Sequence, residues 1–122
     1  MTETEASEAL RAREPIFHRP ELGTSRGQFE RMTDERFWEV GASGRVYERD
    51  FVLDNLEQRY ASPYADNWEV TEFCCRAVGG SVFLVTYLLT QGSRRSRRAT
   101  LWRYTDEWRA LYHQGTLVSD GG

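Results

Sequence analysis

The second half of the chain is a succession of β-type hydrophobic patterns separated by short turns. Four runs rich in β-branched, aromatic and leucine residues follow one another, at 68–78, 81–91, 97–105 and 107–118. Gly79 and Gly80 separate the first two runs, and a polar turn at 105–107 separates the last two. Glycine and polar residues between such runs are typical of hairpin connections. The pattern therefore predicts a meander of four antiparallel strands.

The first half of the chain carries helical signals. Residues 6–14 are good helix formers, and Pro15 ends this run because it has no N–H for a helical hydrogen bond. Further on, Ser25 and Gln28 have the spacing of a capping box. We therefore predict two helices, one over 6–14 and a short one over 26–32.

A hairpin and a third helix are predicted before the meander. Two β-rich runs within 37–47 flank a turn at 42–44, where Gly44 can take a positive φ. The next segment, 48–60, has side chains at helical spacing on one face, namely Phe51, Val52, Asn55, Leu56 and Arg59. We expect an amphipathic helix there, followed by a polar loop at 61–67.

Helices gathered early and strands gathered late indicate an α+β fold, a curved antiparallel sheet wrapped around N-terminal helices. The strand at 81–91 is apolar on both faces, since Val82, Leu84 and Leu88 alternate with Phe83, Val85, Tyr87 and Leu89. Helices on one side would cover only one of these faces. The simplest second cover is a homodimer formed through the outer face of the sheet. The alternative is a central strand covered by the chain's own termini.

Composition narrows the class of protein. The 122 residues suit one domain spanning 1–122, with frayed ends at 1–5 and 119–122. A net charge of -3 gives no indication of nucleic-acid binding. The longest uncharged apolar run, 82–90, is shorter than the roughly 20 residues of a membrane-spanning helix, and the N-terminus lacks the apolar core of a signal peptide. We expect a cytoplasmic protein that binds neither nucleic acid nor membrane.

The sequence shows no metal or cofactor motif. Cys74 and Cys75 are the only cysteines and, as strand neighbours, point to opposite faces. They are expected to be small buried thiols, because a zinc site needs more cysteine or histidine at ligand spacing. We therefore expect no metal and no cofactor.

The order of elements, together with the stretches "FWEVGASGRVYERDFVLDNLE", "RRATLWRYTDEW" and "YHQGT", resembles the nuclear-transport-factor-2-like superfamily. More narrowly, it resembles the SnoaL-like, bacterial branch of unknown function that carries a C-terminal His-Gln-Gly-Thr strand. The resemblance covers roughly residues 7 to 118 and implies a cone-shaped half barrel with a ligand pocket at its wide mouth. It also implies homodimers that pack through the outer sheet faces.

The resemblance also suggests which residues line the pocket. By comparison with relatives it places Arg98, Thr100 and Trp102 inward on one strand, and it places His113 inward and Gln114 outward on the last strand. A β-bulge would reverse this assignment. Trp38 and His18 complete the candidate ligand-binding set, with Trp38 pointing in and its neighbour Glu39 pointing out.

Each candidate also has a purely structural interpretation. His113 can be a buried group bonded to backbone or tyrosine, His18 can cap the first helix, and Trp38 and Trp102 can be core residues. The arginine cluster at 93–98 can protect a sheet edge, or can bind phosphate or an acidic partner.

The sequence is compatible with three functions. The first is a small-molecule-binding domain with a pocket for an apolar or weakly anionic ligand. The second is a cofactor-free cyclase, isomerase or dehydratase with His113 as general base, because the stretch 40–44 has no acid where the superfamily's isomerases carry a catalytic Asp. This hypothesis would be contradicted if His113 were sealed from solvent and both of its ring nitrogens were bonded to protein. The third is an assembly or partner-binding protein.

Overall fold

The computed structural model describes residues 1–62 and 67–119. Six strands form one sheet in this part of the chain. The helices are α1 (Glu3–Arg11), α2 (Arg26–Met32) and α3 (Arg49–Tyr60), with a short 3-10 helix, η1, at Pro20–Leu22. The strands are β1 (Thr33–Val40), β2 (Val46–Glu48), β3 (Glu69–Gly79), β4 (Val82–Gln91), β5 (Arg94–Tyr104) and β6 (Trp108–Leu117).

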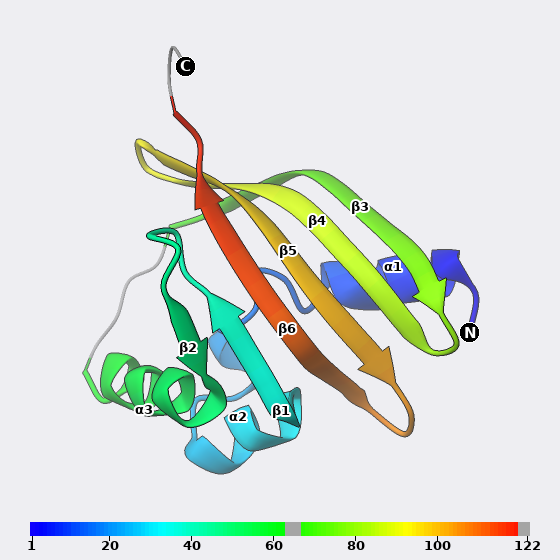
Figure 1. Ribbon diagram of the computed structural model, residues 1–122, viewed down its shortest axis with the longest axis horizontal. Coiled ribbons are helices and arrows are strands. Elements are labelled where there is room, and N and C mark those ends of the chain that lie inside the picture. Colours follow the sequence, from blue (N-terminus) through cyan, green and yellow to red (C-terminus); the bar gives the residue numbers. More distant parts are fainter. Residues whose placement is uncertain (63–66, 120–122) are drawn as a thin grey trace.

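The sheet has the order β2-β1-β6-β5-β4-β3, and its curvature is visible in Figure 1. The four strands β3 to β6 form the predicted antiparallel meander. The sheet as a whole is mixed rather than antiparallel, because β1 pairs with β6 in parallel. This pairing brings the early hairpin of β1 and β2 beside the end of the chain, and it could not be read from local patterns.

The helices lie on one face of the sheet. Helix α1 packs on β3 and β4, whereas α2 and α3 pack around β1 and against each other. Between helices and sheet lies a core in which Trp102, Phe29, Phe37, Phe83 and Leu53 are almost fully buried. Burial of such side chains is the dominant stabilising contribution to a domain of this size.

Helix α2 begins as predicted. The Ser25 hydroxyl accepts a hydrogen bond from the Gln28 N–H, and the Gln28 side chain accepts one from the Ser25 N–H. Helix α3 also lies close to its predicted range.

Helix α1 lies three residues earlier in the chain than the predicted range 6–14. Thr2 and Glu5 form a capping box, and the helix therefore starts inside the segment expected to be frayed. The helix ends at Arg11, before the turn that brings Glu14 into the core.

Two other predictions fall partly outside the described residues. The polar loop at 61–67 includes residues 63–66, and the expected frayed end at 119–122 includes 120–122. Among the helices that the structure describes, none combines the length and the apolar character that crossing a bilayer requires.

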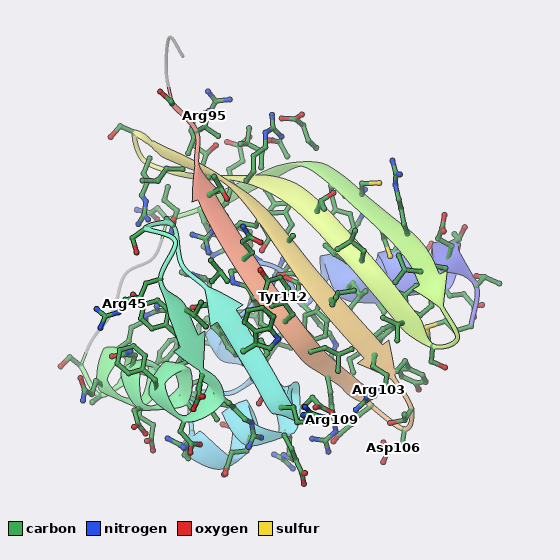
Figure 2. The ribbon with its side chains drawn as sticks, viewed as in Figure 1. Arg45, Arg95, Arg103, Asp106, Arg109 and Tyr112 are labelled. Atoms are coloured by element: carbon green, nitrogen blue, oxygen red, sulfur yellow. The ribbon has the colours of Figure 1, made fainter. Side chains whose placement is uncertain are left out.

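The face of the sheet opposite the helices carries a row of apolar and aromatic side chains. Leu84 pairs with Leu101 across β4 and β5, Leu101 pairs with Tyr112 across β5 and β6, and Tyr112 pairs with Trp38 across β6 and β1. The Trp38 and Tyr112 rings lie 4.4 Å apart between centroids, and Figure 2 shows Tyr112 standing on this outer face. We call these four residues the outer row.

Candidate functional site

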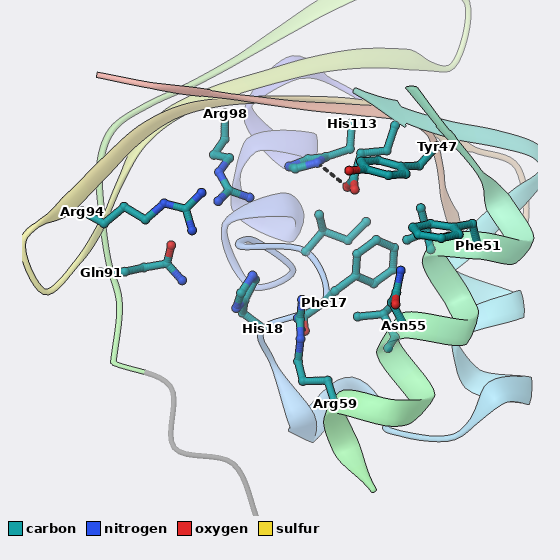
Figure 3. Close-up of a pocket in the computed structure, with 14 residues that line it drawn as sticks. Phe17, His18, Tyr47, Phe51, Asn55, Arg59, Gln91, Arg94, Arg98 and His113 are labelled. Atoms are coloured by element: carbon teal, nitrogen blue, oxygen red, sulfur yellow. Dashed lines mark hydrogen bonds and ion pairs between the residues drawn. The ribbon is translucent and has the colours of Figure 1, made fainter. Parts of the chain in front are cut away.

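A cavity of about 510 Å³ opens between the sheet and helix α3 (Figure 3). One part of its wall is apolar or aromatic and consists of Ile16, Phe17, Tyr47, Phe51, Val52 and Leu56. The other part is polar and consists of His18, Glu39, Asn55, Arg59, Gln91, Arg94, Arg98 and His113. Three arginines against one carboxylate make the described lining strongly cationic.

The helical stripe predicted within 48–60 forms one wall of the cavity. Val52 and Leu56 are buried, whereas Asn55 and Arg59 present polar groups on the same side of α3. The Arg59 guanidinium also donates a hydrogen bond to the Phe17 carbonyl at 3.4 Å. The stripe therefore contributes both an apolar surface and a positive charge.

The segment after α1 supplies the floor of the cavity and is held by a buried carboxylate. Glu14 is 1% exposed, and its side chain accepts hydrogen bonds from the Ile16 N–H at 2.7 Å, the Tyr87 hydroxyl at 2.8 Å and the Trp102 indole at 3.0 Å. Burial, followed by the negative charge of Glu14, raises the pKa of Tyr87 well above its usual value. The tyrosine is therefore a neutral donor to Glu14 at neutral pH.

Phe17 has a strained backbone that turns the floor segment toward the cavity. Its φ is 70°, in the left-handed region that non-glycine residues rarely occupy. Its carbonyl accepts a hydrogen bond from the Tyr60 hydroxyl at 2.6 Å. Contacts to α3 thus fix the conformation that places Phe17 and His18 at the site.

Two arginines of β5 project into the cavity from the same face of the strand. Figure 3 shows the guanidinium groups of Arg94 and Arg98 pointing toward each other. Arg98 is half-buried and Arg94 lies at the exposed mouth. Burial lowers the pKa of Arg98, and the positive charge of Arg94 lowers it further, against the opposing influence of Tyr87 and Glu39.

Gly115 on β6 makes room for Arg98. The two residues pair across β5 and β6, and a Cβ on Gly115 would lie 3.1 Å from Nε of Arg98. The glycine of the His-Gln-Gly-Thr motif therefore lets the arginine stem lie flat over β6.

His113 and Glu39 form a hydrogen-bonded pair at the inner end of the cavity. Nδ1 of His113 lies 2.8 Å from Oε1 of Glu39, and the two residues pair across β6 and β1. His113 is only 3% exposed, and its Nε2 is buried without a hydrogen-bond partner among the described residues. The condition that would exclude a proton-transfer role is thus not met, because only one nitrogen is bonded.

Glu39 is the anionic partner of this pair. Burial works against its ionisation, but the hydrogen bond from His113 and the charges of Arg98 and Arg59 outweigh that effect and lower the pKa of Glu39 below its usual 4.5. An ionised carboxylate only accepts hydrogen bonds, so the proton between the two side chains lies on Nδ1 of His113.

The predicted orientations of Trp38 and Glu39 are wrong. Trp38 is 44% exposed in the outer row, whereas Glu39 lines the cavity on the same face as the buried Phe37. Phe37 and Trp38 are adjacent aromatic residues, so the sequence is compatible with either of two opposite orientations of the strand. The pairing of β1 with β6 also has a register shift between Thr33 and Trp38.

The other candidates divide into cavity and core residues. Arg98, His113 and His18 line the cavity, and Gln114 is exposed on the opposite face as expected. Thr100 and Trp102 face the helices as expected but do not line the cavity, because they are fully buried further along β5. Trp102 instead holds Glu14.

Several lining residues were not proposed from the sequence. Asn55 and Arg59 carried a signal, since they are polar residues within an apolar helical stripe. Arg94 belonged to the cluster at 93–98, but its direction depends on where β5 begins. Tyr47 and Phe51 stack against each other at 4.9 Å between ring centroids, a contact that sequence spacing does not indicate.

The residues described here offer no metal site. No group of three or more His, Cys, Asp or Glu side chains within 1–62 and 67–119 could hold a metal ion. Cys75 is buried and Cys74 half-buried, and neither belongs to the cavity lining.

Comparisons with known proteins identify the fold. No model of a known protein family matches the chain, and no curated protein matches it. Among solved structures, an uncharacterised protein with a cystatin-like fold from Caulobacter vibrioides matches with a TM-score of 0.75 at 15% identity, covering 95% of this chain and 92% of that one. The CamKII hub homology domain of Chlamydamonas reinhardtii matches with a TM-score of 0.72 at 18% identity, covering 98% and 100%.

A third similar structure is an NTF2-like protein of unknown function in nutrient uptake from Rhodospirillum rubrum. It matches with a TM-score of 0.70 at 15% identity and covers 98% of this chain and 100% of that one. The α+β architecture with its curved sheet is therefore the nuclear-transport-factor-2-like fold, as the sequence resemblance implied. At these identities the likeness defines the fold alone.

Proposed function

We propose that this protein binds a small anionic molecule, a carboxylate or a phosphate, in the cavity beside α3. The observation that carries the proposal is the convergence of Arg94 and Arg98 at one end of the cavity (Figure 3). Guanidinium groups bind both kinds of anion through paired, charge-assisted hydrogen bonds.

The charges of the lining favour such a ligand. Arg59, Arg94 and Arg98 face a cavity whose described lining contains one carboxylate, Glu39. The described lining therefore carries more positive than negative charge. Because Arg94 and Arg98 also repel each other, an anion between them would relieve this repulsion.

The apolar part of the lining defines the rest of the ligand. Phe17, Val52 and Leu56 form a hydrophobic surface beside the arginines. A ligand with an anionic head and a short apolar or aromatic body would bury both parts, as small-molecule sites generally do.

A calorimetric titration of the purified protein tests the proposal. The probes are butyrate, benzoate, inorganic phosphate and phenyl phosphate at one fixed ionic strength, so that carboxylate and phosphate are distinguished. We expect at least one probe to bind, and Arg94→Gln to weaken that binding about tenfold or more, because a charged hydrogen bond is lost.

Arg97→Gln is the matched control for this titration. Arg97 lies on the other face of β5, exposed, with its guanidinium 3.5 Å from Glu72. The substitution Arg97→Gln removes one positive charge from β5, as Arg94→Gln does, and is expected to leave binding unchanged. Equal weakening by both variants would show general attraction rather than a site and would contradict the proposal.

We also propose that the protein self-associates through the outer row. Leu84, Leu101, Tyr112 and Trp38 continue across four strands on the face that the described helices leave uncovered. Burial of such a continuous apolar surface stabilises homodimers. The likeness to a hub homology domain is compatible with self-association.

A further inference from the structure

The Glu39–His113 pair restricts which chemical groups the proposed ligand can carry. An ionised Glu39 accepts a hydrogen bond from the Nδ1–H group of His113, and the neutral form of the imidazole then presents a lone pair at Nε2. This atom is buried and has no partner among the described residues. A buried nitrogen acceptor without a partner is costly, and most such groups are satisfied in native proteins.

Two polar side chains lie near Nε2, and neither donates a hydrogen bond to it. Figure 3 shows the imidazole ring pointing toward Arg98, whose Nε already donates to Ser96 at 2.9 Å. The residue opposite His113 on β5 is Thr100, whose Oγ1 is likewise buried and without a partner within the described chain. Directly opposed residues bring their Cβ atoms to about 5 Å, so the two polar side chains are neighbours.

His113 lies close to the same arginine that would hold the anion. Arg98 lies over Gly115, two residues from His113 on the same face of β6. An anion bound between Arg94 and Arg98 would therefore lie beside His113.

We infer that the ligand is an anion that also carries a hydroxyl or N–H group, which donates a hydrogen bond to Nε2 of His113. The arginines hold its charged head, and His113, oriented by Glu39, selects for the donor. This inference rests on the proposed anion binding and names the chemical class within it. It assigns Glu39 the role of a positioning residue.

Pairs of carboxylates that differ by one hydroxyl test the inference by titration. The probes are propionate and lactate, butyrate and 3-hydroxybutyrate, and benzoate and 3-hydroxybenzoate. In at least one pair we expect the hydroxyl form to bind about three to ten times more tightly, as one additional hydrogen bond permits. His113→Phe should remove this difference while the unsubstituted partner still binds.

Gln114→Ala is the control, because Gln114 is the next residue on β6 but is exposed on the opposite face. It should keep the preference. If the paired acids bind equally well to the wild-type protein, the inference is wrong and the anion site stands. If neither member of any pair binds, and the probes of the first titration also fail, the anion site itself is refuted.

Nitrogen NMR of the imidazoles provides a test that needs no substitution, in case His113→Phe does not fold. The chain has two histidines, so the His113 signals can be assigned with a His18→Gln variant. We expect a protonated Nδ1 and an Nε2 without a proton, whose signal shifts when the hydroxy acid is added but not with its partner acid. An Nε2 that carries a proton, or one that does not respond to the hydroxy acid, would overturn the inference.

Discussion

Glu14 shows how a single buried side chain positions the site. Its carboxylate receives hydrogen bonds from the floor segment, from β4 and from β5, and so joins three parts of the chain. Hydrogen bonds to a charged group each contribute about 1.5 to 3 kcal/mol, more than bonds between neutral groups. Ile16, Phe17 and His18 depend on this anchor for their place in the cavity.

The substitution Glu14→Gln tests this role. The NH2 group of the glutamine amide would face at least one of the groups that now donate a hydrogen bond to Glu14. Because two donors cannot bond each other, that group would be left unsatisfied. We expect the free energy of unfolding to fall by about 3 kcal/mol. Urea denaturation measures it, with Glu8→Gln, an exposed position of α1, as a control that should change stability by less than about 0.5 kcal/mol. A Glu14→Gln protein as stable as this control would refute the anchoring role.

At the scale of the elements, the alternation of side chains between the two faces of a strand decides which residues reach the site. On β5, Arg94 and Arg98 face the cavity while Arg97 faces outward to Glu72, so the arginine cluster divides between two surfaces. On β1, Phe37 and Glu39 face inward and Trp38 outward. A shift of one residue in either strand would exchange these sets.

Alanine substitutions on β1 test this parity. Phe37→Ala removes a side chain that is 2% exposed and should cost about 4 kcal/mol of stability. Trp38→Ala removes a side chain that is 44% exposed and should cost less than half as much. Urea unfolding at several protein concentrations measures both, since Trp38 also lies in the proposed contact surface. A larger cost for Trp38→Ala at every concentration would contradict the assignment.

The sequence predicted most elements because their signals are local. The capping box at Ser25, the helical stripe around Leu56 and the glycines at 79 and 80 each involve neighbouring residues. The site was less predictable because it depends on contacts between distant segments. The parallel pairing of β1 with β6 joins Glu39 to His113, 74 residues apart, and no local pattern encodes that pair.

At the scale of the whole molecule, the two faces of the sheet are expected to have separate roles. The inner face packs on the helices and closes the cavity, whereas the outer row lies on the opposite face. Self-association through the outer row would therefore leave the cavity mouth open. Ligand binding and assembly are expected to be independent of each other.

The substitution Leu101→Glu tests the assembly proposal. Leu101 occupies the middle of the outer row, and a carboxylate there would have to lose its water on association. We expect the dimer mass in sedimentation or light-scattering measurements to fall to that of a monomer. Gln58→Glu adds the same charge at an exposed position of α3 and should leave the dimer intact. A wild-type protein that is monomeric at high concentration would contradict the proposal.

Native mass spectrometry tests the central claim, that the cavity holds a small anion, most directly. Spectra would be recorded for protein taken straight from the expression host and again with the anionic probes added, and then repeated under denaturing conditions. We predict one adduct of a small acid per chain, lost on denaturation, absent from Arg94→Gln and retained by Arg97→Gln. Spectra that show the mass of the chain alone with every probe, or the same adduct in both variants, would contradict the account.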